Sequence, residues 1–491
     1  MRTRSQTETK PSPESVEPSP APAGADPRIA LLREAGVLED LQRFSHATER
    51  ARAVHTKGCG AFGTFTVTHD ITRLCCAGLF GAVGRRTDVL ARFSMMRGER
   101  GSADAERDIR GFSVRFFTDE GNWDLVGTHL PVSWVRDPGK FVPLMQSFGR
   151  DPQGDLHDPN ARWDFLSQNP ETLHLLTMLC SDRGIPAGYR FMSGFGVHAF
   201  SLLSAGGERV WCKFHLLSLQ GSRTLTDQDA AARIGDDRDA AQRDLLEAIA
   251  RGEFPKWRLC VQCMSSADAE GLRWNPFDAT KVWPHASYPL VPIGELELNR
   301  NASSHREEIE QAAFRPSAFV RGIEPSPDPL LRARLLSYAD AQFHRLGPEH
   351  ERSEVNASRC PVRSVLRGAA SLLTPTATTP SPAQARSDAA WARGEAIAAR
   401  FAAATDHDDC AQPGALFRML DERHRERLTA RMARSLAQAA LSVQMRQIAL
   451  LLRADDEYGT RVAQRLGLDA SQLATSRPRV STSTLMTSGA D

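Results

Sequence analysis

Apolar and polar residues alternate in a series of short runs through the central part of the chain. The first run, GCGAFGTFTV, begins at Gly58 after a glycine-rich turn. Further runs follow it: DVLARFSM, GFSVRFFT, WDLVGTHLPVSWV, GVHAFSLLS, RVWCKFHLLSL, WRLCVQCM and LVPIGELELN. Alternation of this kind is typical of strands that bury one face. Many short strands with turn residues between them predict an antiparallel barrel or sandwich.

Helical patterns interrupt this β-rich centre and follow it. The predicted helices cover Pro27–Ala35, Glu171–Cys180, Thr226–Arg251 and Pro329–Ala341. Thr226 and Asp227 form an N-cap signal for the third of these. Towards the C-terminus, apolar residues recur close to helical spacing at Leu428, Met432, Leu436 and Val443. The pattern therefore predicts an α+β protein with a helical C-terminal region.

The composition suits a soluble globular protein. The chain has 491 residues, of which 25% are charged and 41% hydrophobic, and its net charge is +1. Such a balance does not favour nucleic acid or a membrane surface as a partner. No run reaches the roughly eighteen apolar residues of a membrane helix, and the polar, proline-rich start lacks the apolar stretch of a secretory signal. We expect a cytoplasmic protein.

The nine cysteines are scattered, and their odd number argues against a complete disulfide framework. Reduced thiols are the simpler interpretation, which agrees with a cytoplasmic location. Cys260 and Cys263 form a CxxC, but they alternate with apolar residues as in a strand. Because no second pair completes a zinc site, we expect no metal there.

Three segments carry candidate chemistry. His55 lies between basic residues and the glycine-rich turn, although a histidine is more often structural. Arg334 precedes Tyr338 by one helical turn, so both share a helix face, and a guanidinium beside a phenol favours the phenolate. An ordinary surface contact is the simpler explanation of that pair taken alone. The third segment, NPFDATKVWPH, reads as an irregular loop that leads into a strand.

Longer motifs connect these segments. They are RFSMMRGERGSADAERDIRGFSVRFFTDEGNWDLVG, SDRGIPAGYRFMSGFGVHAF, NPFDATKVWPH with YPLVPIGELELNRN, and RLLSYADAQFHRLG. In these motifs the sequence closely resembles the haem catalases, from about Asp40 to Gly347 and weakly again in the C-terminal helices. The resemblance implies a catalase-like fold: a central antiparallel β-barrel with inserted helices, a wrapping segment and a C-terminal helical region.

The resemblance also implies roles for single residues. The distal catalytic histidine falls on His55, and the serine that hydrogen-bonds its imidazole falls on Ser94. The proximal tyrosinate that ligates the haem iron falls on Tyr338, with Arg334 as its charge partner. The remaining haem-contacting positions are Arg52, Arg92 and Arg345 at the propionates, Phe141 on the haem face and Val54 beside the distal histidine. A carboxylate near the substrate passage corresponds to Asp108 or Asp328.

The chain departs from the family pattern mainly on the distal side. Thr128 replaces a distal asparagine; its hydroxyl can donate one hydrogen bond but reaches less far. Ser133 replaces a phenylalanine and Trp134 follows it. His129 is predicted to point to the opposite face of its strand. In the proximal motif, Leu336 and Ala339 replace a usual phenylalanine and proline.

The resemblance implies cofactors and partners as well. Haem iron is the implied cofactor, hydrogen peroxide the substrate, and a homotetramer with interlocked N-terminal arms the assembly. Binding of NADPH stays open. The residues expected to contact it are kept at His174, Arg183, Trp283 and His285, but Ser193 and Leu217 stand where asparagine and lysine are expected, and the loss of lysine removes a phosphate partner.

These inferences divide the chain into segments. The expected order is a disordered tail over 1–26, an N-terminal arm over 27–54, a β-barrel haem domain over 55–303, a wrapping segment with the proximal ligand over 304–372, a linker over 373–388, a helical region over 389–470 and a flexible tail over 471–491.

The implied activity is the decomposition of hydrogen peroxide to water and dioxygen. One imidazole, that of His55, would move a proton from one peroxide oxygen to the other, oriented by Ser94, with Thr128 nearby. Two alternatives stay open. One is a catalase-like peroxidase or a haem enzyme that transforms organic hydroperoxides, for which Thr128 and Ser133 leave room. The other is a haem-carrying relative without turnover, against which His55 and Tyr338 argue.

Overall fold

The structure is a computed structural model that describes residues 27–48, 51–151, 153–360, 381–404 and 407–470. Its centre is an antiparallel sheet that closes on itself. The strands of the ring follow the order β7-β5-β4-β3-β2-β1-β9-β8, and pairing of β7 with β8 closes it. The ring strands are β1 (Gly58–Val67), β2 (Arg86–Met95), β3 (Arg110–Thr118), β4 (Gly121–Thr128), β5 (Gly194–Phe195), β7 (Arg209–Ser218), β8 (Lys256–Met264) and β9 (Val291–Asn301). β6 (Phe200–Leu203) and β10 (Ile323–Pro325) extend the sheet beside β7. The predicted β-barrel is confirmed.

The barrel forms because each alternating run turns its apolar residues inward. Buried aromatic rings fill the interior, among them Phe65, Phe93, Phe116, Trp123 and Trp257. The predicted strands are all present, and Cys260 and Cys263 lie in β8 as the alternation indicates. The run WDLVGTHLPVSWV is a strand only as far as Thr128, because Pro131 lacks the N–H that a ladder needs.

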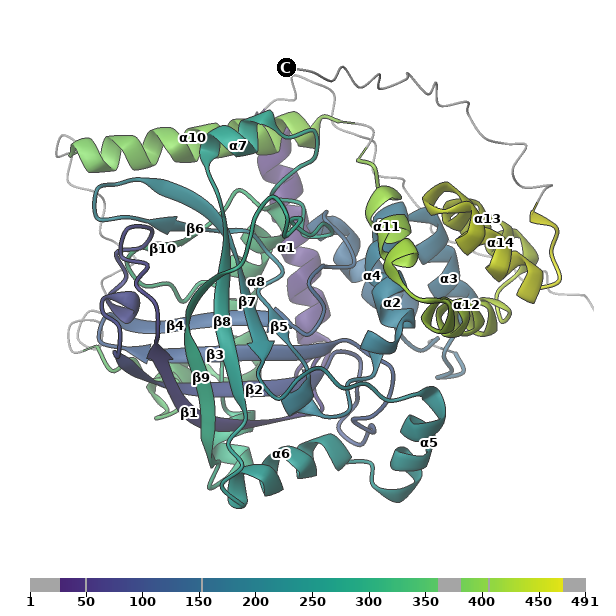
Figure 1. Cartoon of the computed structure of the whole chain (residues 1–491), viewed down its shortest axis with the longest axis horizontal. Helices are drawn as coiled ribbons and strands as arrows, with labels where there is room; N and C mark the ends of the chain where they lie inside the picture. Colours follow the sequence, from purple (N-terminus) through teal and green to yellow (C-terminus); the bar gives the residue numbers. More distant parts are fainter. Residues whose placement is uncertain (1–26, 49–50, 152, 361–380, 405–406, 471–491) are drawn as a thin grey trace, which may run out of the picture.

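Helices surround the barrel (Figure 1). They are α1 (Pro27–His46), α2 (Phe141–Phe148), α3 (Pro159–Gln168), α4 (Leu173–Cys180), α5 (Asp227–Asp236), α6 (Ala240–Ala250), α7 (Ser266–Gly271), α8 (Pro329–Leu346), α10 (Pro382–Ala402), α11 (Ala411–Met419), α12 (Glu422–Leu436), α13 (Leu441–Ala454) and α14 (Asp456–Arg465). Shorter helical turns occupy Gly78–Phe80, Pro138–Lys140, Pro170–Thr172, Asp182–Gly184, Tyr189–Phe191, His305–Glu310 and Pro348–Arg352.

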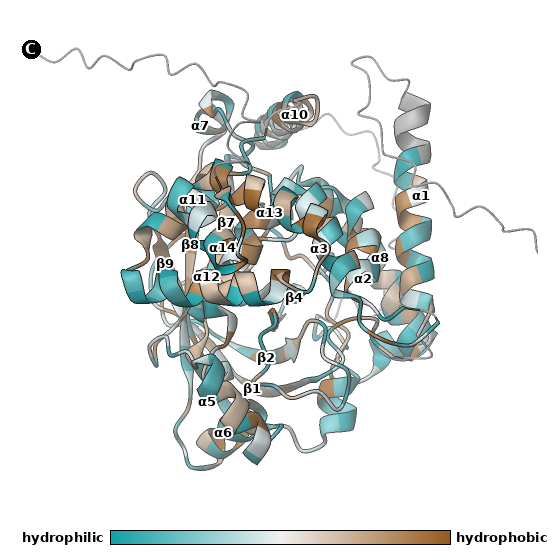
Figure 2. Cartoon of the chain, turned by 90° about the vertical axis from the view of Figure 1, so that its right-hand side faces the viewer, coloured by the Kyte–Doolittle hydropathy of each residue, from teal (hydrophilic) through white to brown (hydrophobic). Residues whose placement is uncertain are grey.

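Three helix predictions need correction. The first helix does not end at Ala35 but runs on to His46, where it packs along α8, as Figure 2 shows. The predicted helix over Thr226–Arg251 is two helices. Thr226 caps α5 with a capping box, and the Asp104 carboxylate accepts the Ala241 and Gln242 N–H groups at the start of α6. The helix predicted to end at Ala341 continues to Leu346.

The C-terminal helices form a second core against α2, α3 and α4. Buried Leu428, Met432, Ile448 and Tyr458 pack there with Trp163 and other residues of those helices. α10 begins at Pro382, inside the predicted linker, and its Gly394 lies against Trp211 of the barrel, where a Cβ atom would come within 2.4 Å of the ring. The predicted tails over 1–26 and 471–491, and the first half of the linker, 373–380, lie outside the described residues. Among the helices that are described, none is long and apolar enough to cross a membrane.

Candidate active site

A cavity lies between the barrel wall, α1 and α8, in two adjoining chambers of about 190 and 140 Å³. His55, Val54, Thr128, Phe141, Arg334 and Tyr338 border both chambers. Arg52, Arg92, Ser94 and Arg345 border the first. The structure thus brings the predicted catalytic and haem-contacting residues to one cavity, although they come from distant parts of the chain.

One side of the cavity is built by a row of residues across three strands. Ser94 of β2 pairs with Gly111 of β3, which pairs with Thr128 of β4. Gly111 is needed at the middle of this row. A Cβ atom there would come within 2.4 Å of the Ser94 Oγ and 3.0 Å of the His55 Nδ1. Glycine therefore lets the imidazole lie flat against the barrel wall.

His55 lies in the segment just before β1, with a positive φ of 63°. Non-glycine residues seldom adopt this conformation, although histidine does so more often than most. Its N–H donates to the Met96 carbonyl at 2.9 Å, and its Nδ1 is hydrogen-bonded to the Ser94 Oγ at 3.0 Å. Burial, together with the positive charge of Arg92, lowers the pKa of His55 to about 4. The imidazole is therefore neutral at physiological pH and available as a base.

Thr128 ends β4 at the same cavity. Its hydroxyl donates its single proton to the Leu130 carbonyl, with an oxygen–oxygen distance of 2.7 Å. That hydroxyl therefore has no proton left to offer a ligand in the cavity, contrary to the sequence-based expectation. The next residue, His129, points to the opposite face, as predicted: its Nδ1 accepts from the Arg110 N–H, and its Nε2 lies 3.1 Å from the Arg183 carbonyl oxygen.

The facing side of the cavity comes from α8. The Arg334 Nη2 donates to the Tyr338 hydroxyl oxygen at 3.1 Å and to the Val126 carbonyl at 3.3 Å. The start of the helix is fixed by Asp328, whose Oδ1 accepts the Leu330 and Leu331 N–H groups. α1 supports the exposed side of the helix, since the His46 Nε2 lies 2.9 Å from an Asp340 carboxylate oxygen. The Arg334–Tyr338 pair thus projects from a helix held at its start and along its side.

Three arginines gather at one end of the cavity around one carboxylate. An Arg52 Nη donates to the Glu310 carboxylate at 2.5 Å, an Arg92 Nη lies 3.6 Å from it, and Arg345 donates to the Glu310 main-chain carbonyl at 2.6 Å. Burial and repulsion from Arg92 and Arg345 hold the pKa of Arg52 well below its usual range. Burial and repulsion from Arg92 also lower the pKa of Arg345 to about 10. The three guanidiniums together carry more positive charge than the single Glu310 carboxylate neutralises.

This excess charge is a test of whether haem fits. Buried charges are costly unless they are paired, and the Arg92 Nε is buried without an acceptor among the described residues. Haem carries two propionate carboxylates, which would balance the three arginines together with Glu310. Its iron would meet the Tyr338 oxygen on α8, and the apolar Val54 and Phe141 side chains would contact the macrocycle. The residues present therefore fit the group.

Sequence reasoning missed some residues of the site. Glu310 lies in the polar segment HREEIE, which carries no recognisable motif. His198 is buried, and its Nδ1 lies 2.7 Å from the Asp328 carboxylate.

The two aspartates considered for the substrate passage hold segments of the protein. Asp328 links His198 to α8, and Asp108 accepts hydrogen bonds from the Arg97 main-chain N–H and guanidinium. Neither aspartate borders the two chambers.

The residues considered for NADPH do not border the active-site chambers. The His174 Nδ1 lies 2.9 Å from the Thr280 carbonyl oxygen, and the Trp283 indole donates to the Pro276 carbonyl. Arg183 and Ser193 border a small cavity of about 50 Å³. The rings of His174 and Trp283 are therefore held by hydrogen bonds to main-chain carbonyls of the protein itself.

The chain is similar in sequence to known proteins over most of its length. The family model described as Catalase matches residues 15–384, and the model described as Catalase-related immune-responsive matches residues 403–466. A protein named Catalase from Aliivibrio fischeri is 45% identical over 90% of this chain and 94% of its own length. Catalase A of Pseudomonas putida is 44% identical over 89% of this chain and 94% of its own length.

Solved structures agree as well. A structure described as that of a bacterial catalase has a TM-score of 0.76 and 33% identity, and covers 95% of this chain and 97% of its own. Catalase A from Saccharomyces cerevisiae has a TM-score of 0.75 and 32% identity, and covers 89% of this chain and 93% of its own.

Proposed function

The chain belongs to the catalase family and decomposes hydrogen peroxide, and we propose that it does so with a haem held between His55 and Tyr338. The observation that carries this proposal is the shared cavity: a neutral imidazole, a phenol with its own guanidinium, and a surplus of buried arginines all border it. The imidazole suits the peroxide, the phenol suits the haem iron, and the arginines suit the haem propionates.

When bound, the haem iron supplies the redox chemistry that splits the O–O bond of one peroxide and oxidises a second to dioxygen. The protein has to hold the iron and move protons. The Tyr338 oxygen would ligate the haem iron, with the Arg334 guanidinium, 3.1 Å away, as its charge partner. Arg52, Arg92 and Arg345 would hold the two propionates and so orient the haem.

His55 carries the proton. Heterolysis requires that one peroxide oxygen lose a proton and that the other gain it. The neutral His55 imidazole accepts that proton at its free Nε2 and returns it to the leaving oxygen, while Ser94 holds the ring through Nδ1. Such acid–base help is worth about 10²- to 10⁴-fold in rate.

The proposal includes an assembly and a location. We propose a homotetramer, the assembly that the family resemblance implies, and a cytoplasmic protein, which fits the cysteines of the described residues, all of which are free. Haem is the only cofactor proposed. Leu217 in place of a lysine leaves a phosphate of NADPH without its cationic partner, so we expect NADPH to bind weakly or not at all.

The experiment separates this activity from the alternatives. Purified protein with its haem is given hydrogen peroxide while dioxygen is recorded, and then an organic hydroperoxide with a reducing co-substrate. We expect one dioxygen for every two hydrogen peroxides and much slower turnover of the organic substrate. Rapid turnover of the organic hydroperoxide without dioxygen from hydrogen peroxide would replace the proposal by the peroxidase alternative.

A further inference from the structure

A second cavity, of about 300 Å³, lies between α3, α4 and the C-terminal helix α12. It is separate from the active-site chambers, but it shares a wall with the smaller of the two. Trp134 borders both that chamber and the second cavity. Trp134 itself is buried and packs against Phe148, with the ring centroids 5.5 Å apart. None of the proposed catalytic steps uses this cavity.

The cavity has an apolar part and a cationic part. The apolar side chains that border it are Trp134, Phe148, Trp163, Leu166, Leu176 and Leu179. The guanidiniums that border it belong to Arg97, Arg107, Arg162, Arg431 and Arg434. Asp227 is the carboxylate that borders it with them. The lining therefore suits a ligand that is apolar along most of its length and negatively charged at one place.

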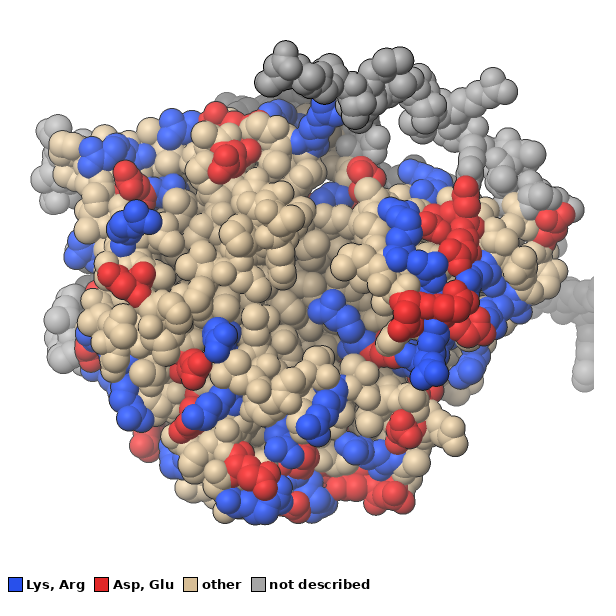
Figure 3. Space-filling model, viewed as in Figure 1, with Lys and Arg blue, Asp and Glu red and all other residues tan. Residues whose placement is uncertain are grey.

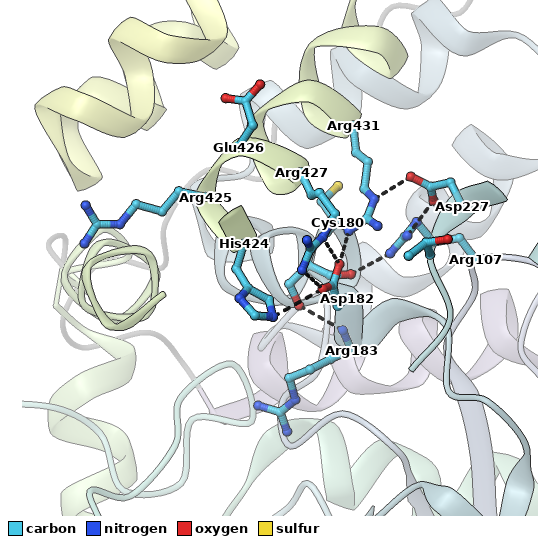
Figure 4. Close-up of polar contacts among 12 residues, drawn as sticks. Arg107, Cys180, Asp182, Arg183, Asp227, His424, Arg425, Glu426, Arg427 and Arg431 are labelled. Carbon is cyan, nitrogen blue, oxygen red and sulfur yellow. Dashed lines mark hydrogen bonds and ion pairs between the residues drawn. The ribbon is translucent and has the colours of Figure 1, made fainter. Parts of the chain in front are cut away.

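Three of the arginines, Arg97, Arg107 and Arg431, are already committed to carboxylates of the protein, and the partner of Arg97 is Asp108. Figure 4 shows Arg107 and Arg431 converging on Asp227, and Arg431 and Arg427 on Asp182. The nitrogen–oxygen distance to the Asp227 carboxylate is 2.7 Å for Arg107 and 2.6 Å for Arg431. The Nη2 of Arg431 is nevertheless buried without an acceptor among the described residues. This network joins α12 to the barrel domain and fixes one end of the cavity.

Arg162 and Arg434 are different, because within the part of the chain that the structure describes no carboxylate lies within ion-pair distance of either. The Arg162 Nη2 donates only to the Ser435 hydroxyl, at 3.1 Å. Burial lowers the pKa of Arg162, and repulsion from Arg97 lowers it further. Charged side chains of both signs gather over the C-terminal helices at the right of Figure 3, whereas the cavity is bordered by five guanidiniums and a single carboxylate.

We propose that this cavity binds an aliphatic monocarboxylate, with its carboxylate at Arg162 and its chain against Trp134, Leu166 and Leu176. The planar guanidinium fork matches a carboxylate in geometry, and transfer of alkyl carbons from water to the leucine and tryptophan wall is favourable. The bound chain would lie against the Trp134 ring, whose other side faces the peroxide chamber. This inference goes beyond the proposed peroxide activity and does not depend on it.

Calorimetric titration of the full, haem-containing chain tests the proposal without any peroxide. The probes are decanoate, decan-1-ol, propionate and inorganic phosphate. We expect decanoate to bind at one site per chain, and the other three, each lacking either the charge or the chain, to bind much more weakly. Arg162→Gln should weaken decanoate binding by about tenfold or more, since it removes a charge-assisted hydrogen bond.

Arg73→Gln is the matched control, because it removes the same charge from an exposed loop that does not border the cavity. It should leave decanoate binding unchanged. Arg434→Gln is a second test variant at the exposed rim and should weaken binding to a smaller extent. The proposal is overturned if decanoate does not bind, if both test variants bind it as the wild type does, or if phosphate binds as tightly as decanoate.

Discussion

The two sides of the active-site cavity are built in different ways. On the proximal side, Arg334 and Tyr338 lie one turn apart on α8, and a single regular helix sets their geometry. On the distal side, His55 comes from a segment with a positive φ, and its surroundings depend on the register of β2, β3 and β4. The proximal pair needs only local spacing, whereas the distal site needs three strands in register.

This difference shows where the site can vary. A shift of one turn in α8 would move Tyr338, the proposed iron ligand, out of the cavity, and the Arg334–Tyr338 pair is intact here. The distal side keeps His55 and Ser94 but differs from the family pattern at Thr128 and Ser133. We infer that the proximal side decides whether haem is held and that the distal side adjusts how fast peroxide reacts. Four predictions test this division.

The largest effect is expected from Tyr338→Phe. The phenol oxygen is the only protein ligand proposed for the iron, so the variant should lose all or nearly all of its haem. Haem absorbance per protein chain, measured after purification, checks this. Tyr288→Phe removes a phenol oxygen outside the cavity and should keep full haem. A Tyr338→Phe protein with full haem and full activity would contradict the proposal that Tyr338 ligates the iron.

A smaller but still large effect is expected from Thr128→Asn. The Thr128 hydroxyl donates to the Leu130 carbonyl, so the wild-type site offers peroxide no donor there. A preorganised donor of this kind is worth about 10²- to 10³-fold in rate, and the asparagine amide should recover part of that. Oxygen evolution at saturating peroxide and equal haem content is the measurement.

Thr128→Val is the control for that substitution, because it keeps the shape of the side chain without its hydroxyl. It should turn over peroxide at about the wild-type rate. If Thr128→Asn is no faster than wild type, or if Thr128→Val is much slower, then Thr128 does more for the wild-type site than its hydrogen bond indicates.

Next in size is Arg92→Gln, which tests the arginine cluster. A hydrogen bond to a charged group contributes about 1.5–3 kcal/mol, so haem affinity should fall by about 10- to 100-fold. Haem transfer to an excess of an apoprotein acceptor measures this. Arg86→Gln, at the exposed end of the same strand, should have no effect. Equal haem loss from both variants would show that the propionates do not lie at Arg92.

The smallest effect concerns pH. Because burial and Arg92 lower the pKa of His55 to about 4, the imidazole stays a base throughout the neutral range. The value of kcat/KM should therefore be flat between about pH 8 and about pH 5 and should fall only as the pH drops towards about 4. A fall centred near the ordinary histidine value, at about pH 6.5, would contradict this description of His55.

The sequence predicts the proximal side better than the distal side, because the proximal pair depends on local spacing and the distal site on contacts between strands. The spacing of Arg334 and Tyr338 is visible in one segment, whereas the row Ser94–Gly111–Thr128 depends on strand register, which the alternation of residues does not specify. The break between α5 and α6 could not be predicted locally, since Asp104, far away in the chain, caps the second helix. Glu310 could not be predicted, because its place in the site depends on contacts with Arg52 and Arg92, which lie far away in the chain.

The extension of α1 to His46 has a similar origin. The predicted end at Ala35 rested on the local pattern, but the helix continues because Leu41 and Phe44 border the active-site cavity and the His46 ring stacks on His344 of α8. Local signals therefore located the elements, and contacts between distant segments decided where the elements end.

The most direct test of the whole account is oxygen evolution by His55→Ala at the same haem content as the wild type. The account predicts that this variant keeps its haem, because the proximal side is untouched, and that dioxygen release from hydrogen peroxide falls by about 10²- to 10⁴-fold. His157→Ala, which removes an exposed imidazole, should leave both properties unchanged. Dioxygen release by His55→Ala close to the wild-type rate would contradict the assignment of His55 as the proton carrier.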